Sequence, residues 1–275
     1  MLVAENISVA VQRREILHQV SIQISPGRFS VVAGPNGAGK STLLRILSNE
    51  MTANAGLVKV NGNALSTYHA RALSQVRAVL PQHTQVQFAF TVEQIVGLGR
   101  HAHTTTRDEN AAILAEVMAL TETEKFRKRI YHSLSGGERQ RVQLARVLAQ
   151  VWETSVFPRY LLLDEPTASL DIAQQDIIFN LARAACKRNI GVLAIVHDLN
   201  LAVQYADDIL FLREGRCVAY GTTEQVFSQD NVAETFGCPV TLYHLANRAH
   251  PFVVPEKKAD ISLPLLKVSN QYSNQ

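Results

Sequence analysis

Residues 34–42, with the sequence GPNGAGKST, restrict the fold of this chain more than any other segment. They match the phosphate-binding pattern GxxxxGK[ST], known as the P-loop, and they lie between an apolar run over residues 29–33 and a helical pattern that follows. Glycines in such a loop allow backbone N–H groups to curl round phosphates, and the next helix adds partial positive charge at its N-terminus. The P-loop therefore predicts a strand, a loop and a helix that together bind a nucleoside triphosphate.

Every residue of the P-loop is expected to line the bound phosphates. These residues are Gly34, Pro35, Asn36, Gly37, Ala38, Gly39, Lys40, Ser41 and Thr42. The ammonium group of Lys40 would reach the β- and γ-phosphates, and the hydroxyl group of Ser41 would bind Mg²⁺. A glycine-rich turn that binds nothing is the alternative, but the complete match between a strand and a helix disfavours it. ATP and Mg²⁺ are the expected cofactors.

Two neighbouring acids, Asp164 and Glu165, follow the apolar run over residues 160–163. Ligands of open α/β sheets bind beyond the carboxyl ends of the strands, so these acids are expected at the same site as the P-loop. Asp164 is placed to hold the Mg²⁺ shell, whereas Glu165 is expected to point elsewhere and to orient and deprotonate the attacking water. Two solvated acids at a strand end are the alternative.

A second glycine-rich turn covers residues 134–138, Leu-Ser-Gly-Gly-Glu, and is called the Ser-Gly-Gly turn below. Ser135 and Glu138 have the spacing of a capping box at the start of a helix. Gly136 and Gly137 leave that helix start open to an anion. Since the P-loop already holds one triphosphate, the Ser-Gly-Gly turn is predicted to bind the γ-phosphate of an ATP held by another copy of the chain. A plain helix N-cap is the alternative.

The order of the remaining patterns predicts an α/β fold with a mostly parallel sheet flanked by helices. Strands are expected over residues 20–24, 29–33, 57–60, 76–80, 160–163 and 191–196, with a hairpin over 209–212 and 217–220. Strands in turn with helices form parallel sheets, whereas the early alternating strands favour an added antiparallel sheet. Residues 91–149 are predicted to be an inserted helical subdomain. The main domain is expected to span residues 1–237, before an irregular extension over 238–275 with a frayed end.

Composition limits the kind of function. Apolar residues make up 47% and charged residues 19% of the 275 residues, which disfavours extensive disorder. The net charge is +3 and the basic residues are scattered, so we expect no nucleic-acid partner. The three cysteines form no CxxC pair, which argues against a disulfide framework and a structural zinc site. Neither a signal-peptide pattern nor a membrane-spanning apolar run is present, so a cytoplasmic protein is expected.

Together, the P-loop, the Ser-Gly-Gly turn and the acids at 164–165 resemble the Walker A, signature and Walker B motifs of ABC ATPases. Three shorter matches extend the resemblance over about residues 2–235. Gln82, after Leu-Pro, resembles the Q-loop of the family, His197 resembles its switch histidine, and residues 169–171, Ser-Leu-Asp, resemble its D-loop. The resemblance implies the ABC-ATPase form of the P-loop NTPase fold and hydrolysis of ATP coupled to transport.

The resemblance also implies a head-to-tail homodimer that holds two ATP molecules, each between the P-loop of one copy and the Ser-Gly-Gly turn of the other. Glu165, His197 and Gln82 would be the catalytic residues. His197 would contact the γ-phosphate, and Gln82 would bind Mg²⁺ or the water and pass motion to a membrane partner. Taken alone, His197 would be a satisfied histidine at a strand end and Gln82 an ordinary loop residue.

The implied partners are two membrane permease subunits and, indirectly, a periplasmic substrate-binding protein. The chain itself would lie at the cytoplasmic face of the bacterial inner membrane as a peripheral subunit.

Two positions depart from the family pattern. An aromatic residue usually stacks on the adenine, whereas Val11 stands at that position here. The guanidinium group of Arg13 or Arg14 would cover the base instead, or the contacts to the base are weak. The Ser-Gly-Gly turn ends in Glu138 rather than the commoner glutamine, and either side chain completes a capping box.

The sequence from His197, HDLNLA, and that from Gln225, QVF, resemble ATPases of importers for iron chelates, haem and cobalamin. The insertion over residues 151–160 and the tail motifs FGCPV and HPFVVP are similar to haem-import ATPases. Haem uptake is therefore the predicted role, with ferric siderophore or cobalamin import as alternatives. ABC ATPases that act on ribosomes or DNA are less favoured, because their familiar forms carry two cassettes, long coiled coils or zinc modules.

Overall fold

The computed structural model describes residues 1–12, 14–82, 84, 86–167, 170–246 and 248–256, and a six-stranded sheet forms its centre. The strand order is β10 (Arg216–Thr222), β9 (Asp208–Arg213), β3 (Phe29–Ala33), β8 (Ile190–Ile195), β7 (Arg159–Leu163) and β6 (Arg77–Leu80). The strands β9, β3, β8, β7 and β6 run parallel to their neighbours, and β10 runs antiparallel to β9. The predicted mostly parallel sheet is confirmed.

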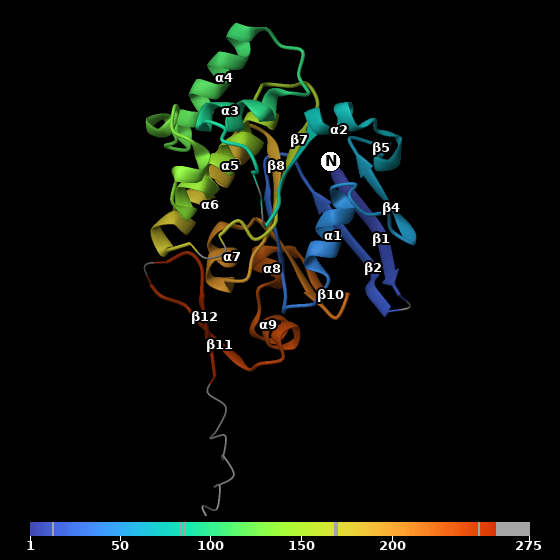
Figure 1. The fold of residues 1–275 in the computed structure, drawn as a ribbon. Coiled ribbons are helices and arrows are strands. Elements are labelled where there is room, and N and C mark those ends of the chain that lie inside the picture. Colours follow the sequence, from blue (N-terminus) through green and yellow to red (C-terminus); the bar gives the residue numbers. More distant parts are fainter. Residues whose placement is uncertain (13, 83, 85, 168–169, 247, 257–275) are drawn as a thin grey trace, which may run out of the picture.

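Both faces of the central strands β3, β7 and β8 are buried, between the layers that Figure 1 shows on either side of the sheet. Successive side chains of a strand point to opposite faces, so Leu161 and Leu163 pack into one apolar cluster while Tyr160 and Leu162 pack into the other. Strands with two buried faces are apolar at nearly every position, which explains the long apolar runs in the sequence.

Helices cover one face of the sheet. They are α3 (Val92–Gly97), α4 (Arg107–Leu120), α5 (Gly136–Val151), α6 (Ile172–Lys187) and α7 (Leu199–Tyr205). Each of the first three begins with a capping box, in which Thr91, Thr106 or Ser135 exchanges hydrogen bonds with a glutamine or glutamate three positions later. Residues 91–149 are therefore largely helical, as expected, and their standing as a separate subdomain stays a prediction.

The other face carries α1 (Lys40–Leu47) and a four-stranded antiparallel sheet. Its order is β2 (Arg14–Ile24), β1 (Leu2–Val11), β4 (Ala55–Val60) and β5 (Asn63–Ala64). Leu43 and Leu47 of α1 are fully buried in the cluster that joins the two sheets. The early alternating strands predicted this added antiparallel sheet. The sequence analysis did not predict β1, which is one of its strands. The strand expected from residue 76 starts at Arg77, because Val76 ends α2 (Ala70–Val76).

The segment after Gly237 differs from the expected irregular extension. It follows α8 (Thr223–Val226) and α9 (Gln229–Phe236), and it forms a hairpin of β11 (Val240–Tyr243) and β12 (Phe252–Pro255). Leu242 and Val253 pack against the helical side of the core, so side-chain burial stabilises the strand pair although Pro239, Pro251 and Pro255 lie in or beside it. Residues 257–275, where the frayed end was expected, lie outside the described residues.

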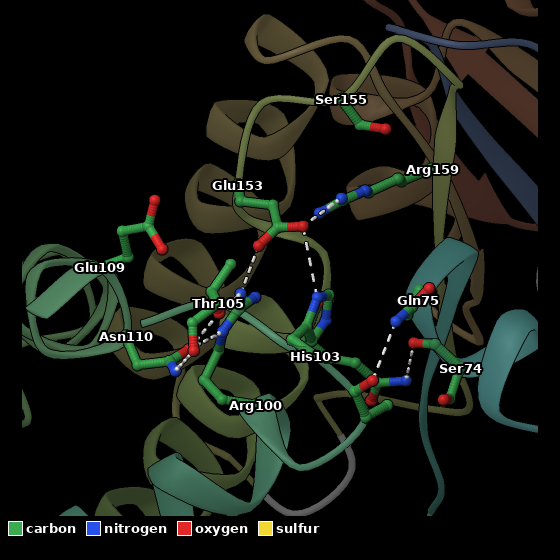
Figure 2. Close-up of polar contacts among 12 residues, drawn as sticks. Ser74, Gln75, Arg100, His103, Thr105, Glu109, Asn110, Glu153, Ser155 and Arg159 are labelled. Atoms are coloured by element: carbon green, nitrogen blue, oxygen red, sulfur yellow. Dashed lines mark hydrogen bonds and ion pairs between the residues drawn. The ribbon is translucent and has the colours of Figure 1, made fainter. Parts of the chain in front are cut away.

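A polar network joins the helical stretch to the sheet at the end of α5, and Figure 2 shows its members. Glu153 lies in the insertion before β7, and its carboxylate contacts Arg100, His103 and Arg159. Arg100 also donates to the carbonyl oxygen of Ala149 over 2.8 Å. Burial alone would raise the pKa of Glu153, but hydrogen bonds from Arg159 and Arg100 outweigh it and lower the pKa to about 2. We call these four charged or titratable residues the Glu153 network.

No helix among the described residues is both long and apolar enough to cross a bilayer.

Candidate nucleotide site

Four neighbouring strands bring the predicted site residues together. The strands β3, β8, β7 and β6 are adjacent in the sheet and parallel, so their carboxyl ends lie along one edge. The P-loop follows β3, His197 follows β8, Asp164 and Glu165 follow β7, and Gln82 follows β6. Residues from four distant parts of the sequence thus meet at the edge where α/β sheets bind their ligands.

The glycines of the P-loop permit its close packing. A Cβ atom on Gly34 would lie 2.0 Å from the carbonyl oxygen of Leu212, so a side chain there would collide with β9. Gly39 has a φ of 100°, and a Cβ atom there would lie 2.7 Å from a methyl group of Leu17. Gly39 is also the N-cap of α1 and makes no side-chain cap, which leaves the first N–H groups of the helix for another acceptor. The loop is thus built to offer backbone donors to an anion.

Lys40 lies in the P-loop with its ammonium group directed at backbone oxygens. Its Nζ atom donates to the carbonyl oxygens of Gly34 over 2.8 Å and of Pro35 over 2.9 Å. The side chain is buried, and this burial lowers the pKa of Lys40, while the nearby charges of Glu165 and Asp164 oppose the shift. Phosphate oxygens would be stronger acceptors for this cation than the two carbonyl groups.

Ser41 and Asp164 place a hydroxyl oxygen and a carboxylate oxygen close together beside Lys40. The hydroxyl group of Ser41 donates to Oδ1 of Asp164 over 3.4 Å. Burial raises the pKa of Asp164, and the negative charge of Glu165 raises it further. A hard divalent cation prefers hydroxyl and carboxylate oxygens, and it would offset the charge that raises this pKa. The residues present therefore fit a Mg²⁺ site.

Glu165 points away from Asp164 to a different set of partners. Its backbone has a φ of 48°, a left-handed conformation that is uncommon outside glycine. One carboxylate oxygen accepts from Nε2 of Gln82 over 2.6 Å, and the other lies 2.6 Å from Nε2 of His197. The structure thus places two of the predicted catalytic side chains, Gln82 and His197, in direct contact with the third, Glu165.

A cavity of about 340 Å³ opens beside the P-loop. Glu165 lines one part of it, and Arg14 and Ile16 of β2 line another. Val11, at the position where the family has an aromatic residue, is 44% exposed and pairs with Arg14 across the β1–β2 ladder. Arg14 thus lines the cavity, and its contact with a bound base stays a prediction, whereas Arg13 lies outside the described residues.

The Ser-Gly-Gly turn has the local geometry that the sequence predicts. Glu138 N donates to Oγ of Ser135 over 3.3 Å, and Ser135 N donates to the Glu138 carboxylate over 2.8 Å. Ser135 and Gly136 are exposed, and a Cβ atom on Gly136 would meet nothing within 4 Å. All residues of the turn and of the P-loop are described, and no hydrogen bond joins Ser135, Gly136 or Gly137 to the P-loop of the same chain.

The structure describes only part of residues 169–171, which resemble the D-loop. Ser169 lies outside the described residues, whereas Asp171 caps α6 by accepting a hydrogen bond from Gln174 N over 2.8 Å. The sequence analysis did not identify Gln140, which donates to the carbonyl oxygen of Pro166, or Gln174, which accepts from Arg141 and packs against Gly137. No local pattern marks these glutamines, because each contact joins segments at least 26 residues apart.

Comparisons with known proteins extend this picture beyond the motifs. The family model described as ABC transporter matches residues 17–168. The hemin import ATP-binding protein HmuV of Gloeobacter violaceus is 42% identical over 267 residues, which cover 96% of this chain and 97% of that protein. HmuV of Rhizobium meliloti is 40% identical over 258 residues, which cover 93% of this chain and 98% of that protein.

A solved structure of an inward-facing ABC transporter, assigned to the metal-chelate type, has a TM-score of 0.78 to this chain. The two are 27% identical, and the match covers 94% of this chain and 98% of the other. The likeness therefore includes most of the chain and extends well beyond the P-loop.

Proposed function

Because this chain belongs to the ABC transporter family and is an ATP-hydrolysing transport subunit, we propose that it powers the import of haem through a separate membrane permease. One observation carries the choice of haem: proteins named for hemin import match nearly the full length of the chain at 40–42% identity. The metal-chelate type of the similar solved transporter agrees with this class of substrate.

In the proposed reaction, the P-loop holds the phosphates of ATP and the remaining residues prepare the attacking water. The N–H groups of the loop and the ammonium group of Lys40 bind the β- and γ-phosphates. A Mg²⁺ ion held by Ser41 and Asp164, with Gln82 nearby, would neutralise part of the phosphate charge. Glu165 then accepts the proton of the water, and its contacts with Gln82 and His197 support this role by fixing the carboxylate in place.

We further propose that two copies of the chain bind two ATP molecules in a head-to-tail homodimer. The Ser-Gly-Gly turn supports this arrangement, because it presents an exposed helix start that the P-loop of its own chain does not use. A γ-phosphate at this helix start would accept hydrogen bonds from Ser135 and from the N–H groups of Gly136 and Gly137.

A groove beside α3 suits the permease subunits. Its cavity has a volume of about 380 Å³ and an apolar lining that includes Phe88, Phe90 and Leu98. Phe88 is 68% exposed and Leu98 is 51% exposed, and apolar side chains gathered in one groove favour coverage by a partner. The groove lies a few residues after Gln82, so a permease segment seated there would influence the contact between Gln82 and Glu165.

This assembly would lie at the cytoplasmic face of a bacterial inner membrane, where the chain is peripheral. A periplasmic substrate-binding protein would deliver haem to the permease from the opposite side.

Reconstitution tests the proposal directly. The chain is purified together with its permease, inserted into vesicles, and supplied with Mg-ATP and either haem, a ferric siderophore or cobalamin. ATP-dependent uptake of haem, absent with Glu165→Gln, is the expected result. If the vesicles take up the ferric siderophore or cobalamin and not haem, the assignment of haem as the substrate is wrong. Co-purification with ribosomes or nucleic acid, and with no permease, would contradict a role in transport.

A further inference from the structure

A cavity of about 390 Å³ lies at the edge of the central sheet opposite the nucleotide site. The insertion before β7 and the turn between α6 and β8 form its wall. Because β7 and β8 are parallel and both begin beside this cavity, it lies at their amino ends, whereas the nucleotide site follows their carboxyl ends. We call it the insertion pocket. The lining side chains that bear on its function are those of Trp152, Ser155, Phe157, Arg159 and Arg188.

Two buried hydrogen-bond donors belong to side chains of the insertion pocket. Within the part of the chain that the structure describes, neither Nε1 of Trp152 nor Nη1 of Arg159 has a hydrogen-bond partner. Trp152 is 4% exposed and Arg159 is 8% exposed, so bulk water does not take the place of the missing acceptor. A buried donor without an acceptor is destabilising. A ligand with oxygen acceptors would therefore be stabilised in the pocket once these side chains turn toward it.

The charges around the insertion pocket favour an anion. Among the described residues, Glu153 is the only carboxylate that pairs with Arg100 or Arg159, so two buried guanidinium groups share one negative charge. Figure 2 shows Glu153 between these two arginines. Arg188 adds a third guanidinium group, which pairs with the exposed Glu116 over 2.5 Å. One positive charge therefore has no carboxylate partner, and a buried charge is stabilised by a partner of opposite sign.

The arrangement of the donors favours a phosphate group over a carboxylate. The guanidinium group of Arg188 lies 4.5 Å from the centre of the Trp152 ring, and arginine N–H groups pair well with phosphate oxygens. Ser155 is exposed, and its Oγ accepts from the N–H group of Phe157 over 3.3 Å, so the hydroxyl hydrogen can be donated to a ligand. A tetrahedral phosphate presents oxygens in several directions, whereas the two oxygens of a carboxylate lie in one plane.

From these observations we propose that the insertion pocket binds a phosphate group, with Arg159 and Arg188 as its cationic partners. Trp152 and Ser155 donate the further hydrogen bonds. Free phosphate and the headgroup of an anionic phospholipid both carry such a group. Phe157 at the pocket is 66% exposed and the adjacent Val156 is 95% exposed, so the chains of a bound lipid would meet apolar side chains. The site goes beyond the proposed transport function and does not depend on it.

Thermal melts of the full-length chain with inorganic phosphate test the free ligand. Mg-ADP saturates the P-loop throughout, and sodium chloride at the same ionic strength is the salt control. Phosphate at ten times its dissociation constant should raise the melting temperature by about 3 °C. Arg188→Ala should abolish this rise, whereas Arg107→Ala removes the same charge from an exposed position outside the pocket and should keep it.

Ser155→Glu gives a second test that does not remove a cation. Its carboxylate would occupy the insertion pocket in place of the ligand, so the melting temperature without phosphate should rise and the response to phosphate should disappear. Ser155→Gln has nearly the same size and no charge, and it should retain most of the response.

Sedimentation with lipid vesicles tests the second source of the phosphate group. Wild type should bind vesicles that contain phosphatidylglycerol at least fivefold better than vesicles of phosphatidylcholine alone if a lipid is the ligand. Arg188→Ala and Phe157→Ser should each abolish that preference. Phe157→Ser should leave the response to free phosphate unchanged, because it removes only the apolar contact.

A response in either experiment that Arg188→Ala removes and Arg107→Ala keeps supports the site, and the experiment that gives it identifies the source of the phosphate. Should Arg188→Ala unfold, loss of the response in Ser155→Glu but not in Ser155→Gln decides the same question. No response of wild type in either experiment, or equal responses in Arg188→Ala and Arg107→Ala, would overturn the proposal.

Discussion

Two glutamates of this chain, Glu153 and Glu165, have opposite surroundings. Glu153 contacts two arginines and a histidine, and these partners are almost fully buried. Glu165 contacts Gln82 and His197, of which His197 is 44% exposed, and it borders an open cavity. Strong charge compensation stabilises the fold at Glu153 but would make a carboxylate a poor proton acceptor. At Glu165 the two partners are an amide and an imidazole, and the open cavity lets water and phosphate reach the carboxylate.

The change with the largest expected effect is Glu165→Gln. Loss of the general base should lower ATP turnover by about a thousandfold, since such groups contribute factors of 10² to 10⁴. The melting temperature should stay within about 2 °C of wild type, because an amide can keep the contacts to Gln82 and His197. Phosphate release and a thermal melt measure the two effects. Wild-type turnover in this variant would remove Glu165 from the mechanism.

Glu153→Ala should have the opposite effect to Glu165→Gln: it should lower the free energy of unfolding and leave turnover unchanged. It leaves Arg100 and Arg159 buried without their carboxylate, and loss of one partner from such a pair costs about 3 kcal/mol of unfolding free energy. Urea denaturation measures this loss. Turnover per folded molecule, measured well below the melting temperature, should stay close to wild type. A stable but inactive variant would contradict the division between the two glutamates.

The pH dependence of stability sharpens the same comparison. The pKa of Glu153 is about 2 in the folded chain, below its ordinary 4.5, so the folded state resists protonation. This stabilisation is present above pH 4.5 and is lost as the pH falls toward 2. Between pH 5 and 3 wild type should lose about 1–2 kcal/mol more than Glu153→Gln, allowing for solvent screening. Parallel unfolding curves for the two proteins would exclude the ion pairs as a source of stability.

His103 affects the pH dependence of stability at higher pH than Glu153 does. Burial lowers its pKa, and the charge of Arg100 lowers it further, so the unfolded chain takes up this proton first as the pH falls below about 6.5. Stability should therefore decline below that pH, and His103→Gln should flatten the decline between pH 7 and 5. An unchanged slope in this window would show that His103 is not buried in its neutral form.

The smallest expected effect concerns the base of the nucleotide. Val11→Tyr places an aromatic ring next to Arg14 at the cavity wall. Stacking of about 0.5–1 kcal/mol should tighten ATP binding by about two- to fivefold. Titration with a fluorescent ATP analogue detects this change, and turnover at saturating ATP should not change. Weaker binding would mean that the adenine does not lie against this strand.

Local patterns predicted much of the site and a good part of the fold. The P-loop, the acids after β7 and the capping box of Ser135 depend on neighbouring residues, so the sequence contains their full signal. The apolar runs likewise predicted β3, β7 and β8, because strands buried on both faces need apolar side chains at nearly every position.

The remaining features depend on contacts between distant segments. The Glu153 network joins residues 53 positions apart, and Arg141 meets Gln174 across 33 positions. The hairpin of β11 and β12 is stabilised by burial of Leu242 and Val253 against the core, which outweighs the local signal of the prolines. No short window of the sequence contains these pairings.

Light scattering of the Glu165→Gln variant tests the central claim, which is that one chain's P-loop and another chain's Ser-Gly-Gly turn enclose each ATP. With Mg-ATP the measured mass should double, and Ser135→Arg in the same background should keep the protein folded and monomeric. A mass that stays at that of one chain with saturating Mg-ATP, or a dimer that Ser135→Arg leaves intact, would contradict the account.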